Sequence, residues 1–428
     1  MQPGHFYPVP IFFILDKLHF KKSLFKDSLF DFLYTLKLHY LCIKIIFDMK
    51  KYLFLSSLIL LASPATPSCA TTSCEQSDEL SMLVGTYTVK SKSDGIYLFH
   101  FNQHTGEAKL VTSTKIGNPS FLTYTKQPSF VYSVSEFSNA EAAANATPFD
   151  VTSETFGPTR TTLASNVDSG AEDPCNIWTN GHFLVTANYT GGSLSVFSIT
   201  DGGATLKLRQ FIRFQKLLET SVSHIHCARP TPDGKYLLVT DLGNDCIYRF
   251  TINSEADSKE NVPFLTAQRI VYNGPLGWGP RHFVFSNDGQ YVYLINELGG
   301  TIVVFRYING NLLPVQHVLA EEVPAHGSAD IHLSPDGHFL YASHRLQNDG
   351  ISIYRINKAN GLIHKVGYQH TALHPRNFAI TPNGRFLLVA SRDDNCIEVY
   401  RRNKRTGLLQ NIHNNISLPK PVCIDFFK

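Results

Sequence analysis

Short apolar runs, separated by polar turn residues, recur along most of the chain. Four segments align with one another, at 225–250, 280–305, 328–354 and 375–400. Each reads as a strand, a turn of the Pro-Asp-Gly type, a second strand, a second turn and a third strand. Glycine after Asp or Asn supplies the positive φ that tight hairpins require. The pattern predicts successive antiparallel hairpins, with helices nearly absent.

The repeat has a nearly constant period. Its turn glycines are spaced by 55, 48 and 47 residues, and they are Gly234, Gly289, Gly337 and Gly384. Two weaker copies precede them, at 119–136 and 174–197. The second strands, such as YVYLI and FLLVA, are apolar on both faces, as in a sheet that is covered on both sides. A unit of this length with about four strands is typical of a β-propeller.

Counting the units predicts an all-β fold, a seven-bladed β-propeller. Six units are visible as repeats, and the seventh is split between the two ends of the domain. Residues 83–101 lack an inner strand, which the C-terminal PVCIDFF (421–427) can supply. Closing the ring in this way removes an exposed sheet edge. The propeller domain is therefore predicted to span residues 81–428.

Composition agrees with a large folded domain. Of the 428 residues 43% are hydrophobic and 17% charged, which excludes a disordered chain. The formal net charge of +3 comes from the N-terminal segment, because residues 1–70 hold 8 Lys and 4 Asp and leave 30 basic and 31 acidic residues in the body. With no excess of cations to neutralise phosphates, nucleic acid is not an expected partner.

The N-terminal segment has the character of a leader. Residues 49–70, MKKYLFLSSLILLASPATPSCA, combine two Lys, an apolar run and small residues, which is typical of a secretory signal peptide. The run is too short for a membrane span in the mature chain. Residues 1–48 are interpreted as lying before the true start at Met49, the alternative being a membrane-associated extension. We expect an exported, periplasmic protein that begins near Thr71, with lipid attachment through Cys69 as an alternative.

The cysteines and short motifs exclude several chemistries. No pair of the 8 Cys has CxxC spacing, so a zinc site is not expected. Disulfides remain open for an exported chain, but most cysteines of the body lie in strand-like runs and are interpreted as small buried hydrophobes. The chain has no GxSxG, GxGxxG or GxxxxGK motif, so nucleotide binding is unsupported. We expect no metal and no cofactor.

Two positions of the repeat are predicted to meet at one mouth of the central channel. The residue eight before the turn glycine begins the inner strand, and the residue eight after it ends the second strand. Equivalent positions of different blades lie at the same radius and height. The first position holds His226, Arg281, Ala329 and Arg376, and the second holds Leu242, Glu297, Arg345 and Arg392.

Several charges near one axis favour a ligand site over a set of structural salt bridges, because unmatched buried cations are costly. The surplus of Arg indicates an anionic ligand or a developing oxyanion. Arg281 and Glu297 are predicted to face each other across one hairpin, with Arg281 pointing into solvent-filled space. His224 forms an HxH pair with His226, but no third ligand is spaced to complete a metal site, so a hydrogen-bonded histidine at the rim is favoured.

At these residues the chain resembles the seven-bladed propeller lactonase family, which includes bacterial propeller-type 6-phosphogluconolactonases and the related fungal carboxymuconate cycloisomerase. The matching motifs are LVGTYT, DPCNIWTNGHFLVTANYTGGSLSVF, the HIH pair, GPRHFVFSNDGQYVYLINEL, SPDGHFLYASHR and HPRNFAITPNGRFLLVAS. Asn176 departs from a His that is common in the family, and Asp330 from a Glu. The export signal departs too, since 6-phosphogluconolactone is cytoplasmic.

The resemblance implies hydrolysis of a sugar-acid lactone, with a small anionic lactone as substrate. His226, Glu297 and Arg281 are the expected catalytic residues, with Glu297 or His226 as the base. Arg345, Arg376 and His224 are expected to bind substrate. Two alternatives are a cycloisomerase acting on a muconate-type dicarboxylate and an exported, non-enzymatic propeller that binds a glycan or protein. A monomer is expected, because a closed ring needs no partner strand.

Overall fold

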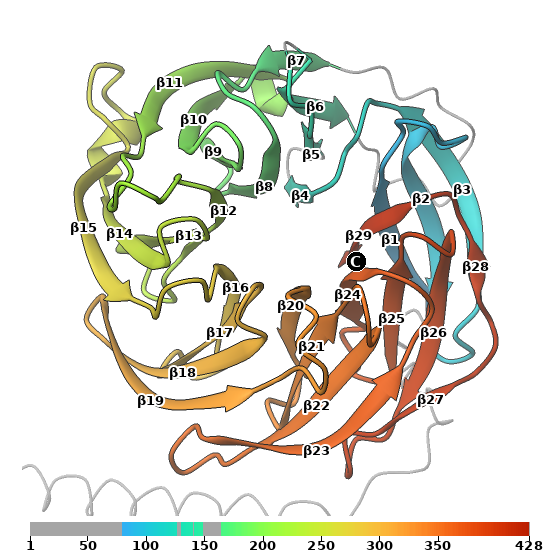
Figure 1. Cartoon of the computed structure of the whole chain (residues 1–428). Coiled ribbons are helices and arrows are strands. Elements are labelled where there is room, and N and C mark those ends of the chain that lie inside the picture. Colours follow the sequence, from blue (N-terminus) through green and yellow to red (C-terminus); the bar gives the residue numbers. More distant parts are fainter. Residues whose placement is uncertain (1–78, 126–129, 140, 149–163, 428) are drawn as a thin grey trace, which may run out of the picture. The chain divides into compact units, whose positions relative to one another are not determined.

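The protein is described by a computed structural model, which covers residues 79–125, 130–139, 141–148 and 164–427. Within these ranges the chain forms seven antiparallel sheets, and its helices are two short 3-10 turns, η1 (Asp201–Gly203) and η2 (Ser254–Asp257). Figure 1 shows the sheets arranged as blades around a central axis. The described part of the chain contains no helix long and apolar enough to cross a membrane. The predicted leader, residues 49–70 with Cys69, lies outside the described residues, and so do Cys42 and Cys74.

Each blade takes its name here from its innermost strand. From the inside outward, the first three blades are β29 (Pro421–Phe427), β1 (Glu79–Thr86), β2 (Gly95–Asn102), β3 (Ala108–Lys115); β4 (Leu122–Thr125), β5 (Phe130–Ser135), β6 (Ala143–Pro148), β7 (Ser165–Asp168); and β8 (Pro174–Thr179), β9 (Phe183–Asn188), β10 (Ser193–Thr200), β11 (Thr205–Arg213). The β29 blade thus combines both ends of the domain, as predicted.

The other four blades correspond to the four strong repeats. From the inside outward they are β12 (Ile225–Pro230), β13 (Tyr236–Asp241), β14 (Cys246–Ile252), β15 (Leu265–Asn273); β16 (Pro280–Phe285), β17 (Tyr291–Asn296), β18 (Thr301–Ile308), β19 (Asn311–Leu319); β20 (Ser328–Leu333), β21 (Phe339–His344), β22 (Gly350–Ile356), β23 (Ile363–His370); and β24 (Pro375–Ile380), β25 (Phe386–Ser391), β26 (Cys396–Arg402), β27 (Leu409–Asn411). β28 (Ile416–Ser417) also pairs with β26.

The inner strands form a closed circle. Each contacts the next in the order β29, β4, β8, β12, β16, β20, β24 and back to β29. β29 pairs with β1 in a register that runs from Ser81 opposite Phe427 to Gly85 opposite Cys423. The prediction of an all-β, seven-bladed propeller closed by strands from both ends is therefore confirmed.

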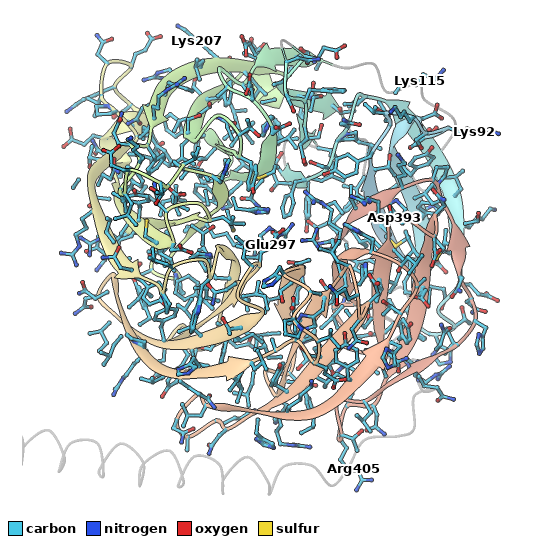
Figure 2. All side chains as sticks on the ribbon, viewed as in Figure 1. Lys92, Lys115, Lys207, Glu297, Asp393 and Arg405 are labelled. Atoms are coloured by element: carbon cyan, nitrogen blue, oxygen red, sulfur yellow. The ribbon has the colours of Figure 1, made fainter. Side chains whose placement is uncertain are left out.

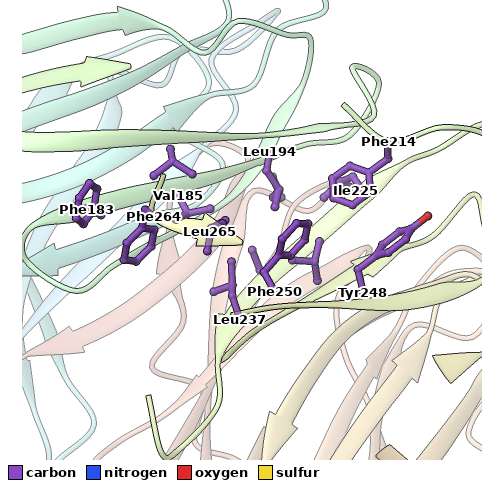
Figure 3. Close-up of a cluster of buried hydrophobic side chains, with 14 of the residues drawn as sticks. Phe183, Val185, Leu194, Phe214, Ile225, Leu237, Tyr248, Phe250, Phe264 and Leu265 are labelled. Carbon is purple, nitrogen blue, oxygen red and sulfur yellow. The ribbon is translucent and has the colours of Figure 1, made fainter. Parts of the chain in front are cut away.

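Apolar layers between neighbouring blades hold the ring together. Figure 3 shows the layer between the β8 and β12 blades, where Phe183 stacks on Phe264 with ring centroids 4.3 Å apart. Fully burying one such side chain stabilises the fold by about 1.5–3 kcal/mol. The second strands are buried on both faces because each sheet lies between two such layers. Five cysteines of the described residues are free thiols, and four of them are buried.

A β-bulge opens most of the inner strands at the end nearer the site. In the β16 blade Pro280 pairs with Asn296 and His282 with Ile295, so Arg281 has no partner in the ladder. The same irregularity releases Cys175, His226, Arg376 and, in the last strand, Val422. Bulges of this kind re-aim a side chain, and here they recur at equivalent positions around the axis.

Candidate active site

The bulged positions and the ends of the second strands bring charged side chains together at one end of the channel. Glu297 follows β17 and accepts hydrogen bonds from two arginines, Arg281 Nε at 2.7 Å and Arg345 Nη2 at 2.9 Å. Each carboxylate oxygen serves one arginine, so the carboxylate is shared by both guanidinium groups. Figure 2 labels Glu297 near the centre of the ring.

Both arginines also donate a hydrogen bond to a backbone carbonyl group. Arg281 is only 1% exposed and donates from Nη1 to the carbonyl oxygen of Ala329 in the next blade, at 2.6 Å. The expectation that Arg281 points into solvent-filled space is therefore wrong, because the bulge turns this side chain against the neighbouring inner strand. Arg345 is also buried and donates from Nε to the Gly327 carbonyl.

A second carboxylate lies on the other side of the site. Glu136, which follows β5, accepts a hydrogen bond from the Tyr87 hydroxyl at 2.8 Å and forms an ion pair with Arg376 at 3.5 Å. The Arg376 guanidinium lies over the Tyr87 ring, 5.4 Å from its centroid. Glu136 and Tyr87 occupy the same register as Glu297 in their own blades. This partner set was not predicted from the sequence.

The two histidines of the HxH pair do not converge on one point. His224 stacks on the Tyr189 ring with centroids 4.4 Å apart, and its Nδ1 lies 3.1 Å from the Tyr189 carbonyl. His226 is buried and meets the edge of the same ring at 5.7 Å. His224 is thus a hydrogen-bonded histidine at the rim. In the described residues no three His, Cys, Asp or Glu side chains are grouped to hold a metal ion.

The arginines and burial together determine the protonation states of Glu297 and His226. Burial alone would raise the pKa of Glu297, but Arg281 and Arg345 outweigh it and hold the pKa of this carboxyl below its usual range. Burial, reinforced by Arg281, holds the pKa of His226 well below its usual range. At neutral pH Glu297 is therefore a carboxylate and His226 a neutral imidazole, which can accept a proton.

A small axial cavity, with room for about one water molecule, lies against His226. It is lined by Ser120, Phe121, Cys175, His226, Arg281, His282, Arg376, Asn377 and Val422. Burial raises the pKa of the Cys175 thiol well above its usual range, which disfavours the thiolate form. The Cys175 Sγ lies 3.5 Å from the His226 carbonyl oxygen.

The other predicted positions play smaller parts. Arg392 pairs with the adjacent Asp393 at 2.7 Å rather than with any carboxylate of the mouth. Leu242 is buried, and Ala329 contributes only its carbonyl. Extending the register of Glu297 into the weak copies would have found Tyr87, Glu136 and Tyr189, since each directly follows the second strand of its blade. The next register, seven residues before the turn glycine, would have found His282, Asp330 and Asn377.

Chemically, the mouth combines three guanidinium groups, two carboxylates and one neutral imidazole. Such a set can bind an anion, stabilise a developing oxyanion and accept a proton. The fold and the site therefore define a seven-bladed propeller with a charged site at one end of its channel.

Comparisons with known proteins name the family. The model of the family "Lactonase, 7-bladed beta-propeller" matches residues 81–426. A 6-phosphogluconolactonase of Formosa agariphila is 39% identical over 342 residues, which cover 77% of this chain and 95% of that protein. A 6-phosphogluconolactonase of Bacillus subtilis is 29% identical, over 80% of this chain and 97% of that protein.

Solved structures agree. A putative 6-phosphogluconolactonase of Bacteroides fragilis superposes with a TM-score of 0.77 at 45% identity, covering 86% of this chain and all of that one. The periplasmic gluconolactonase of Pseudomonas aeruginosa gives 0.72 at 28% identity, covering 82% and 99%. The chain belongs to the seven-bladed β-propeller lactonase family. The predicted family is confirmed, and the predicted lactonase activity agrees with the names of these relatives.

Proposed function

We propose that the protein hydrolyses a sugar-acid lactone that carries a negative charge, as its 6-phosphogluconolactonase relatives are named for doing. The observation that carries this proposal is the mouth itself. Three arginines and two carboxylates leave a net charge of +1 beside a neutral, buried histidine. An anionic lactone would find both its charged group and its carbonyl oxygen within reach of guanidinium donors.

His226 is the better candidate for the base. Both oxygens of Glu297 already accept hydrogen bonds from arginines, so the lone pairs that a base would use are occupied. His226 Nδ1 has no hydrogen-bond partner, and its imidazole is neutral. In this scheme His226 takes a proton from the attacking water, the arginines stabilise the tetrahedral oxyanion, and Glu297 holds Arg281 and Arg345 in position.

The test measures the opening of δ-gluconolactone and of its 6-phosphate by the purified protein, above the spontaneous rate. Faster turnover of the phosphorylated lactone is expected, and a preference for the uncharged one would assign the protein to the type of the periplasmic gluconolactonase. No acceleration of either lactone, with conversion of a muconate-type dicarboxylate or with tight glycan binding, would support one of the two alternative functions instead.

We also propose that the chain is exported, on the strength of the signal-like segment 49–70. Cell fractionation should recover the protein in the periplasm, and mass spectrometry should find a mature N-terminus near Thr71. A mass that includes residues 1–48 would contradict both the start at Met49 and the cleavage. A diacylglycerol on Cys69 would identify a lipoprotein.

A further inference from the structure

Three buried polar atoms around the axial cavity have no hydrogen-bond partner among the described residues. They are Ser120 Oγ, His226 Nδ1 and His282 Nε2. The rings of His226 and His282 are 5.0 Å apart and meet edge to face. Leaving such atoms unsatisfied destabilises the fold, because their desolvation is not compensated by a hydrogen bond. The free space is enough for about one water molecule, and a buried water normally bonds two to four polar groups.

The second nitrogen of His282 is fixed by a carboxylate. His282 Nδ1 lies 2.7 Å from Asp330 Oδ1, and a carboxylate can only accept, so Nδ1 carries the hydrogen. Asp330 is 2% exposed and is held by His332 Nε2 at 2.9 Å and by the Asn377 amide. Nε2 of His282 therefore presents a lone pair to the cavity. An aspartate that orients a histidine in this way also stabilises the imidazolium that forms.

Charge is distributed unevenly between the two histidines. Arg281, Arg376 and Arg345 all disfavour a protonated His226, which has no carboxylate within hydrogen-bond distance. Arg281 also disfavours a protonated His282, but His282 is in direct contact with the Asp330 carboxylate. The titratable or charged groups that bear on His282 are Arg281, Arg229, His226, Asp330 and, through Asp330, His332. A proton is therefore less costly on His282 than on His226.

Building on the lactonase function proposed above, we propose that the His282–Asp330 pair stores the proton that His226 removes from the attacking water, and that one water in the axial cavity carries the proton between the two imidazoles. His282 and Asp330 act through His226 and touch no substrate, so they are positioning residues.

The step balances without a further reactant. As the water oxygen bonds to the lactone carbonyl carbon, one water proton moves to His226 Nε2 and the Nδ1 proton of His226 leaves through the cavity water to His282 Nε2. When the ring C–O bond breaks, His226 Nε2 protonates the leaving alkoxide and the stored proton returns to Nδ1. The product is the hydroxy acid, which ionises in solvent, and every protein group is restored.

Kinetics of three variants of the full chain test the proposal. His282→Gln and Asp330→Asn are each expected to lower kcat about a hundredfold, the low end for a positioned proton-transfer group, with KM nearly unchanged. The double variant should be no slower than either single one, because the two residues act as a unit. Their solvent deuterium isotope effect on kcat should rise, since proton transfer becomes limiting.

A matched control separates this role from a structural one. His338→Gln disrupts a surface histidine–carboxylate pair, in which His338 lies 3.4 Å from Asp336. This variant should keep kcat within about twofold of wild type. Multiplicative losses in the double variant, a change confined to KM, or an equal loss in His338→Gln would overturn the proton store. So would an acyl-enzyme trapped on Ser120, because that serine would then be the nucleophile.

A readout that needs no turnover distinguishes failure of this path from failure of the proposed function. In ¹⁵N-histidine NMR spectra, His282 should be protonated at Nδ1 and lose this preference in Asp330→Asn, and His282→Gln should shift the Nδ1 signal of His226. If no lactone is opened by the wild type, the function fails whatever the spectra show. If lactone is opened but the His226 signal does not respond to His282→Gln, the path is wrong.

Discussion

The four blades from the strong repeats and the three from weak or split repeats build the same backbone but supply different chemistry. The regular blades, named after β12, β16, β20 and β24, contribute His226, Arg281, Glu297, Arg345 and Arg376. The irregular blades, named after β29, β4 and β8, contribute Tyr87, Glu136 and Tyr189 at the same register. Repetition therefore fixes where side chains meet, and divergence between blades makes the ring asymmetric enough to orient a substrate.

The largest effect is expected from Arg281→Ala in the regular half. Activity should fall about a thousandfold because a donor to the oxyanion is lost. Because Arg281 is buried and bonds both Glu297 and the Ala329 carbonyl, the free energy of unfolding should also fall by about 3 kcal/mol. Denaturant melts and kcat/KM measure the two losses. Full activity in a folded Arg281→Ala protein would remove this cluster as the active site.

Glu297→Gln should be the next most damaging change. It keeps the shape but leaves Arg281 and Arg345 without their shared negative partner, so we expect kcat to fall about a hundredfold with a smaller loss of stability. Activity at a rate near wild type would show that the carboxylate only fills space. The matched change in the irregular half is Glu136→Gln.

Glu136→Gln sharpens the comparison because it should change the preference of the protein between charged and uncharged lactones. It raises the net charge of the mouth by one beside Arg376. The KM of the phosphorylated lactone should therefore fall by about fivefold relative to that of the uncharged lactone, as expected for about 1 kcal/mol of Coulomb energy. The ratio of the two KM values, measured at low salt, is the test. An unchanged ratio would place the anion's binding site away from Glu136.

Part of this arrangement could be predicted from the sequence, and part of it could not. The glycine-anchored repeats predicted the blades, the ring closure and the meeting of Arg281 with Glu297, because register alone determines them. The burial of Arg281 was not predictable, since it depends on a bulge that turns the side chain toward Ala329 of another blade. The contact of His282 with Asp330 joins equivalent positions of neighbouring blades, each seven residues before its turn glycine. The repeat therefore places the two backbones side by side, whereas the direction of the two side chains depends on packing.

Lowering the pH should destabilise the four regular blades before the three irregular ones. Burial lowers the pKa of His282 to about 4, and that of His344 and His374 to about 3, and all three belong to regular blades or their loops. Below pH 6.5 the unfolded chain binds protons that the folded chain does not. The contribution of these histidines to the free energy of unfolding is therefore complete above pH 6.5. It falls toward pH 4 by up to about 1.4 kcal/mol per pH unit for each such group.

Denaturant melts between pH 7 and pH 4 measure this slope, and hydrogen exchange locates the blades that open. His282→Gln should flatten the slope, and a parallel pH dependence in the variant would contradict the assignment.

The smallest effect is expected from Arg392→Ala, which removes only a partly exposed ion pair with Asp393. Its kcat/KM should stay within about twofold of wild type.

Ring closure also has a consequence for how the protein is made. β1 is the first strand of the propeller to be synthesised, and its inner partner, β29, is the last. Until residues 421–427 are available, one edge of β1 has no partner, although most of this strand is apolar and buried in the finished ring. The last strand of the propeller must therefore leave the ribosome before the first blade is complete. Until then the open edge is available to chaperones or to other chains, so the final seven strand residues end the period in which aggregation competes with folding.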